Sequence, residues 1–369
     1  TSNNTAMGYG AAYCVTGCQN TAMGSLAMRG NATVTGNCNT AVGMNAMRCI
    51  SAGVCRTVAI GNGALYNFQS NNTVAVGTCA GANTTTPNTN TYVGHFAAYS
   101  NTTGAYNTVI GRSVFYNNTT GTCNTAVGTD ALGKNTTANN NTAIGTLAMG
   151  CNTTGCSNAA VGTFALCCNC TTHENAALGA YALSRQTGFR NVGVGYGSGC
   201  TTSGHCNIFV GWEAGRFVCG ACRVVAIGYQ ALGGGGDKTA NNVMAIGFAA
   251  LCSNTTGTGN HAIGYQAMQF NTTGCHNVGL GQTAFYCNTT GQKNIGIGTS
   301  AGCRNVSGNC NIAIGFQAGK LNCTGSQNTA IGTQAMECNT ANTNTAVGAI
   351  ALNRNTTGTE NTALGYNTL

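Results

Sequence analysis

The sequence predicts an all-β fold, a parallel β-solenoid (β-helix or β-roll) of about 22 coils with 17 residues each. The first observation is that close variants of one unit, Asn-Thr-Ala-(Val/Ile)-Gly-x-x-Ala-(Leu/Met)-x-x-Asn-Thr-Thr-Gly-x-x, recur 22 times in 369 residues. The second is that glycine interrupts every unit, and Asn-Thr-Thr-Gly segments interrupt several, so no apolar stripe with helical period survives. A short fixed period indicates one structural unit stacked many times.

The glycine after the aliphatic residue is taken as position 0 of each unit. It falls at residues 8, 24, 43, 61, 77, 94, 111, 128, 145, 162, 179, 195, 211, 228, 247, 264, 281, 298, 315, 332, 348 and 365. The mean spacing of 17 residues suits one solenoid coil with two or three short sides. Ankyrin and tetratricopeptide repeats are about twice this length.

Three columns of the unit predict the core. Position −1 is Met, Val, Ile or Leu in all 22 units, and we expect it to point inward together with position −3, because alternate residues of a strand share a face. Position +4, usually Leu, Met or Phe, is expected to form a second inward row. Position +3 is Ala in 19 of 22 units, which indicates tight packing.

Position −4 is Asn in 18 of 22 units, and this predicts a ladder of stacked amides at a corner of the coil. The four exceptions are Thr57, Thr73, Val224 and Val243. They lie near steps of irregular length, where we expect small bulges or local changes of twist.

Composition predicts one uncapped repeat domain over residues 1–369, outside the cytoplasm. Charged residues are only 5% of the chain, far below the roughly 25% of ordinary soluble proteins. The 23 cysteines indicate an oxidising compartment, so an extracellular or cell-surface location is expected. No run approaches the ~20 apolar residues of a membrane-spanning helix, so no membrane span is expected.

The Asn-Thr-Thr-Gly segment at positions +7 to +10 admits two interpretations. Asn and Gly tolerate positive φ, so the segment fits a simple turn. Asn-x-Thr/Ser is also the acceptor sequence for N-linked sugars. The glycosylation candidates are Asn31, Asn101, Asn118, Asn135, Asn152, Asn169, Asn254, Asn271, Asn288, Asn305, Asn322 and Asn355.

Cysteines gather at positions +5/+6 and −6/−5, the two ends of that turn, and predict disulfides within single turns. The candidate pairs are Cys14–Cys18, Cys49–Cys55, Cys151–Cys156, Cys200–Cys206, Cys219–Cys222 and Cys303–Cys310. A zinc site at Cys167, Cys168, Cys170 and His173 is a weaker alternative, because the same columns hold cysteines elsewhere without histidine.

No catalytic, cofactor-binding or metal-binding residues are predicted, and we expect no enzyme. The six acidic residues are scattered, and the five histidines share no column. Glycine recurs everywhere, so its short motifs do not indicate a nucleotide site. Eight of the 14 basic residues lie at +5/+6, but a few solvated turn charges explain them better than a nucleic-acid site, so no nucleic-acid partner is expected.

Position +1 is aromatic in eight units and could stack on sugars, contact another protomer or simply cover the surface. These residues are Tyr9, Tyr196, Trp212, Tyr229, Phe248, Tyr265, Phe316 and Tyr366.

The unit, as in Asn141-Thr142-Ala143-Ile144-Gly145, resembles repeats in the head domains of trimeric autotransporter adhesins. It also resembles repeats of phage tail fibres and related surface proteins that end in an endosialidase-type chaperone domain. The adhesin resemblance implies a left-handed parallel β-roll, usually trimeric. Both resemblances imply an extracellular fibre.

The function expected from these features is that of a structural subunit of an extracellular filament or surface fibre, N-glycosylated and assembled by end-to-end stacking of protomers. The main partner is then the protein itself, since the first and last units are ordinary ones. A glycan-binding adhesin or tail-fibre shaft is the alternative. Ice binding ranks last, because Thr occurs singly at −3 and within the turn rather than in a regular Thr-x-Thr face.

Overall fold

The computed structural model describes residues 3–86 and 88–368, and it confirms the predicted parallel β-solenoid. Contacts divide the chain into two compact units, Thr1–Thr187 and Gly188–Leu369, which are treated separately below. The described residues form 22 strands of three residues and no α-helix. The single repeat domain over 1–369 stays a prediction.

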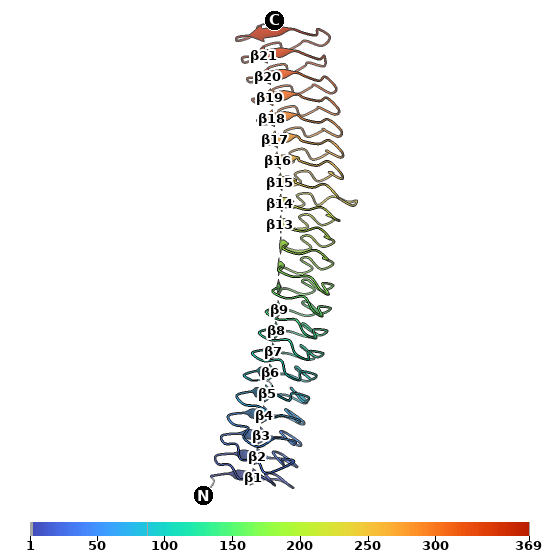
Figure 1. Cartoon of the computed structure of the whole chain (residues 1–369). Coiled ribbons are helices and arrows are strands. Elements are labelled where there is room, and N and C mark those ends of the chain that lie inside the picture. Colours follow the sequence, from blue (N-terminus) through green and yellow to red (C-terminus); the bar gives the residue numbers. More distant parts are fainter. Residues whose placement is uncertain (1–2, 87, 369) are drawn as a thin grey trace. The chain divides into compact units, whose positions relative to one another are not determined.

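In the first unit every strand pairs in parallel with the next strand along the chain, and Figure 1 shows this succession from β1 upward. Equivalent positions stand side by side, as in the pairing of β8 with β9 through Ala126 and Ala143. The strands are β1 (Thr5–Met7), β2 (Thr21–Met23), β3 (Thr40–Val42), β4 (Val58–Ile60), β5 (Val74–Val76), β6 (Thr91–Val93), β7 (Thr108–Ile110), β8 (Thr125–Val127), β9 (Thr142–Ile144), β10 (Ala159–Val161) and β11 (Ala176–Leu178).

The second unit repeats this parallel, in-register pairing from β12 to β22. Its strands are β12 (Val192–Val194), β13 (Ile208–Val210), β14 (Val225–Ile227), β15 (Met244–Ile246), β16 (His261–Ile263), β17 (Val278–Leu280), β18 (Ile295–Ile297), β19 (Ile312–Ile314), β20 (Thr329–Ile331), β21 (Thr345–Val347) and β22 (Thr362–Leu364).

The prediction that positions −3 and −1 point inward is wrong. In β8 the buried residue is Ala126, while Thr125 and Val127 on either side are partly exposed. The same order holds from β2 to β22: the middle residue, position −2, is buried and its two neighbours are not. The aliphatic column therefore lies on the outer face of the sheet.

The asparagine at position −4 explains this orientation. Asn124 is buried, and its backbone N–H donates to Oδ1 of Asn107 at 2.9 Å, while its Nδ2 donates to the carbonyl of Ala138 at 2.9 Å. Strand residues alternate between faces, so a buried position −4 places position −2 inside and positions −3 and −1 outside. The predicted Asn ladder is confirmed, and it fixes which face of the strand turns inward.

The core is narrow and is built from small residues. Alanine at −2 and at +3 is fully buried in most coils, and the larger residues at +4, such as Leu132 and Met149, are buried as well. The inward +4 row and the tightly packed Ala column are therefore as predicted. A one-residue shift of face would place β-branched side chains where only alanine fits.

Exceptions in the core compensate one another by size. Where position −2 is Tyr92, a Cβ on the nearby Gly81 would lie 2.7 Å from its ring. Where position −2 is Phe209, a Cβ on Gly215 would lie 2.1 Å from the ring. In these two coils the large core side chain occupies the space that a Cβ on the glycine would need, as expected for close packing.

Glycine at position 0 is required by a close backbone approach. Gly145 has φ of +131°, and a Cβ there would lie 2.6 Å from the carbonyl oxygen of Gly162 in the next coil. The same contact recurs down the column, so any side chain would separate neighbouring coils. Positions +2 and +4 also have positive φ, even where the residue is as large as Leu147 or Met149. Hydrogen bonds between coils hold these otherwise unfavourable conformations, as from the N–H of Met149 to the carbonyl of Ala165 at 2.9 Å.

The orientation of the strands can be tested in β8. We expect Ala126→Val to destabilise the fold by about 1–3 kcal/mol, because the added methyl groups overfill the core. We expect Val127→Thr to change stability by less than about 0.5 kcal/mol, because that side chain faces outward. Denaturant unfolding followed by circular dichroism measures both. A larger loss for Val127→Thr than for Ala126→Val would contradict the orientation.

Candidate functional surfaces

The asparagines at position +7 form a second buried amide ladder. Nδ2 of Asn118 donates to Oδ1 of Asn101 at 2.5 Å, and Nδ2 of Asn135 donates to Oδ1 of Asn118 at 2.8 Å. In the second unit, Nδ2 of Asn288 donates to Oδ1 of Asn271 at 2.7 Å. Each Nδ2 also reaches the carbonyl three residues on, so the Asn-Thr-Thr-Gly segment closes on its own amide.

This ladder bears directly on the glycosylation prediction, because an N-linked sugar is attached at Nδ2. Asn31 is exposed, and Asn355 is half-buried with its Nδ2 hydrogen-bonded to Asn339 and Gly358. Ten of the twelve candidates are buried, namely Asn101, Asn118, Asn135, Asn152, Asn169, Asn254, Asn271, Asn288, Asn305 and Asn322. At those ten positions the fold leaves no room for a sugar, which favours the turn interpretation there. Glycan occupancy itself stays a prediction.

Position −6 carries a third ladder, which gives several cysteines a role other than disulfide formation. In many coils the backbone N–H at −6 donates to the side chain at −6 of the next coil. The backbone N–H of Thr122 donates to Oδ1 of Asn139 at 2.7 Å. The backbone N–H of Asn139 in turn donates to Sγ of Cys156 at 3.3 Å. The backbone N–H of Cys156 donates to Nδ1 of His173 at 2.8 Å. Asn, Cys and His side chains therefore serve as alternative acceptors at position −6 of the coil.

The predicted disulfides are not formed in the structure. Cys206 is a free thiol, so it is not linked to Cys200. The cysteines of the other five predicted pairs are free thiols as well: Cys14, Cys18, Cys49, Cys55, Cys151, Cys156, Cys219, Cys222, Cys303 and Cys310. In three of these pairs the sulfur at −6, that of Cys55, Cys156 or Cys222, accepts a backbone N–H of the preceding coil.

Thiol contacts run between coils rather than across one turn. The N–H of Cys151 donates to the carbonyl of Cys167 at 2.9 Å, so the two residues are neighbours in successive coils. Burial, and then the nearby thiols of Cys168 and Cys151, raise the pKa of Cys167 to about 12. Such a thiol stays protonated at neutral pH and is a poor nucleophile and a poor metal ligand.

The structure does not gather the proposed zinc ligands into a site. Nδ1 of His173 accepts the N–H of Cys156, and Cys170 is an exposed residue whose thiol faces the carbonyl of Cys168. Within residues 3–86 and 88–368, no three His, Cys, Asp or Glu side chains are placed to hold a metal ion.

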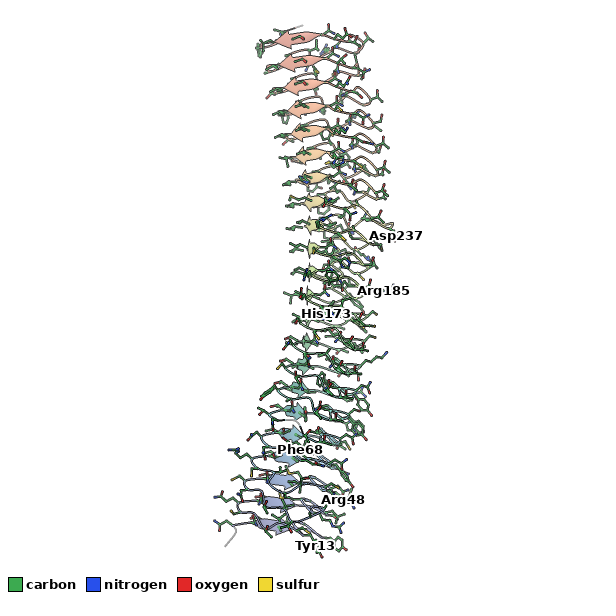
Figure 2. All side chains as sticks on the ribbon, in the orientation of Figure 1. Tyr13, Arg48, Phe68, His173, Arg185 and Asp237 are labelled. Carbon is green, nitrogen blue, oxygen red and sulfur yellow. The ribbon has the colours of Figure 1, made fainter. Side chains whose placement is uncertain are left out.

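Several charged residues are engaged with neighbours. Arg216 forms an ion pair with Glu213, and Nζ of Lys320 lies 3.8 Å from Oε1 of Glu337. Nη1 of Arg48 donates to the hydroxyl of Tyr66 at 2.8 Å. Figure 2 shows Arg48 and Asp237 on the loop side, away from the strands.

The outer face of the strands presents columns of threonine and aliphatic side chains in each unit. In β7 to β9, Thr108, Thr125 and Thr142 occupy one column, and Ile110, Val127 and Ile144 occupy the next. In the second unit the −3 column is more apolar, with Ile208 and Ile295 at 41% and 37% exposure. Exposed apolar surface of this extent usually marks an interaction site.

The aromatic residues at position +1 are exposed in the second unit. Tyr196 stacks on Trp212 with ring centroids 4.4 Å apart, and Phe248 stacks on Tyr229 and Tyr265 at 5.2 and 5.1 Å. Because the rings cover one another, these contacts stabilise the column from coil to coil.

Lys238 is a buried charge that the sequence did not reveal. It lies in the long coil between Gly228 and Gly247, where position +7 is glycine and the amide ladder has no member. Its Nζ donates to the carbonyls of Cys252 and Asn254 at 2.8 and 2.9 Å. Burial lowers its pKa to about 8, and the nearby Cys252 thiol partly opposes this shift.

The chain matches no family model and no curated protein. The resemblance to adhesin-head and tail-fibre repeats therefore rests on the repeat motif and on the β-solenoid fold. Among the residues described, the structure offers no helix with the length and hydropathy needed to cross a bilayer.

The +7 ladder can be tested by replacing one amide. We expect Asn118→Ala to cost about 1–3 kcal/mol, because it leaves buried partners in two coils without hydrogen bonds. Asn117→Ala is the matched control, since Asn117 is exposed and adjacent. Equal unfolding midpoints for the two variants would refute a stabilising ladder.

Lys238 predicts a specific pH dependence. Its folded pKa of about 8 lies below the unfolded value of 10.5, so the unfolded chain binds more protons between these two values. Stability should therefore rise with pH through this window, while below about pH 8 the full cost of burying the ammonium remains. We expect the melting temperature of the wild type to rise relative to that of Lys238→Met between about pH 7 and about pH 9.5. A difference in melting temperature between the two proteins that does not change with pH would exclude the lowered pKa of Lys238.

Proposed function

We propose that the chain is a structural segment of an extracellular filament or surface fibre, which lengthens by adding coils in register. The observation that supports this most directly is the equivalence of the coils within each unit. Every strand presents its neighbour with the same backbone donors and acceptors, and the −4 and +7 amides continue the pattern inside. A coil of another copy meets the same template.

The three ladders would hold the turns of such a fibre in place. Side-chain amides and sulfurs satisfy the turn groups that no strand covers, so the turns are fixed as firmly as the sheet. The proposed extracellular location rests on the repeat resemblance and on the low charge. The thiols give it no further support, because the expected disulfides are not formed.

End-to-end assembly can be tested at the first described strand. Ala6 occupies the core-facing −2 position yet is exposed in β1, whereas Thr5 occupies an outward position. We expect Ala6→Arg to abolish concentration-dependent assembly, because stacking another coil would bury the charge. Thr5→Arg should assemble like the wild type. Sedimentation velocity over a wide concentration range, with electron microscopy, provides the measurement.

A wild type that stays monomeric at every concentration would refute this assembly. So would equal behaviour of Ala6→Arg and Thr5→Arg.

Ice binding is a second candidate, favoured by the outward position of the threonines. The sequence ranks it last because Thr occurs singly at −3 rather than in a Thr-x-Thr face, but the structure places Thr108, Thr125 and Thr142 outward beside an aliphatic column. Regular hydroxyl and methyl groups at strand spacing, about 4.8 Å, can order water. Thermal hysteresis of the wild type, lost in Thr125→Lys but kept in the turn variant Thr103→Lys, would support it.

A further inference from the structure

The outer strand face of the second unit differs in composition from that of the first. At position −3 the first unit has threonine in seven of its eleven coils, whereas the second unit has it in three. At position +1 the second unit has seven aromatic residues and the first unit has one, Tyr9. The second unit thus presents mainly aliphatic and aromatic side chains where the first presents threonine.

Three neighbouring columns make up this apolar face. The −3 and −1 columns lie on the outer side of the strands, as Ile295 and Ile297 do on either side of the buried Gly296. The +1 column borders them, because two residues span at most about 7 Å of chain. Trp212 and Phe316 of this column are exposed. From β12 to β22 every residue of the three columns is exposed or partly exposed, so the face is open along the unit.

The size of the face suits a stable protein interface. Eleven strands at a spacing of about 4.8 Å extend over about 53 Å, and the chain from −3 to +1 spans about 13 Å. These dimensions give an area of up to about 700 Å². Two such faces in contact exceed the roughly 1,000 Å² in total that a specific interface needs.

The face also lacks charge that would hold identical copies apart. The chain has a formal net charge of +8, yet no Lys, Arg, Asp or Glu occupies these three columns in the second unit. Their one histidine is His261. Charged residues are depleted at the centres of protein interfaces, where aromatic residues and Met are enriched. The composition of the face therefore matches an interface core.

The regular spacing of the side chains selects the partner. Because the strands pair in register, each column repeats at the strand spacing of about 4.8 Å through all eleven coils. Side chains arranged in this way interdigitate along the whole face only with a surface of the same period. A second copy of the face has that period.

We propose that two copies of the chain associate side by side through the outer faces of β12 to β22. Packed sheets lie about 10 Å apart, and the aliphatic columns of the two copies fill the space between them. The contact uses the same surface on both copies, so it closes as a dimer. It leaves the first and last coils free, and it does not depend on end-to-end stacking.

Sedimentation velocity of the Ala6→Arg chain tests the proposal, because this variant is the one designed to block end-to-end stacking. We expect a monomer–dimer equilibrium that shifts with concentration. Adding Ile263→Lys and Ile297→Lys should weaken dimerisation about tenfold or more, since each lysine would place an unpaired ammonium group in the interface.

The first unit supplies the matched control, Ile110→Lys with Ile144→Lys in the same Ala6→Arg chain. These two isoleucines also stand two coils apart in the −1 column, and both are 39% exposed, against 39% and 38% for Ile263 and Ile297. Because they lie outside the proposed interface, we expect the control chain to dimerise like its parent.

A milder variant guards against a folding defect. Ile263→Thr with Ile297→Thr keeps β-branched side chains but removes apolar contact, so we expect severalfold weaker dimerisation and an unchanged melting temperature of the monomer. The proposal is overturned if the Ala6→Arg chain stays monomeric at every concentration. Flotation of that monomer with phosphatidylcholine vesicles would assign the face to a lipid surface instead. Equal loss of dimer in the control and the Ile263→Lys with Ile297→Lys chain would also overturn it.

Discussion

The buried asparagine amides are the interaction on which the rest of the structure depends. A coil of 17 residues has only three residues in strand, so most of its backbone polar groups must be satisfied in turns. The −4 and +7 amides do this from inside, each bonding to its equivalent in the neighbouring coil and to a carbonyl of the turn. Removing one amide therefore affects two coils.

These ladders determine both which residues form the core and which residues lie on the surface. A buried Asn at −4 turns the residue at −2 inward, and in most coils the narrow core holds alanine at −2 and at +3 with one larger side chain at +4. The valines and isoleucines that would form the core of an ordinary sheet lie outside, where they cover the strands. The uncharged outer face is a consequence of the internal hydrogen bonding.

The same geometry accounts for two recurring features of the sequence. Cysteine at −6 replaces Asn as the acceptor of a backbone N–H, so a column of cysteines arises without disulfides. At +7 the asparagine closes the turn, and the residue after it bonds to the next coil, as Thr119 does through its hydroxyl to the carbonyl of Thr136. A repeated turn and a repeated modification site are alike in sequence, and burial of Nδ2 distinguishes them.

The sequence by itself determined the β-solenoid, its 17-residue coil, the Asn ladder at −4 and the inward row at +4, because a fixed period and an unvarying glycine leave few other folds. It could not determine which face of the strand turns inward. Hydrophobicity favoured Val127 over Ala126 as the residue that points into the core. The stronger constraint was the hydrogen bonding of the buried Asn124, which lies on the same face of the strand as Ala126. Only the tertiary structure decided the surface, because residues that line one hollow, such as Asn45, Tyr66 and Cys79, come from successive coils, and no spacing within one unit shows how they meet.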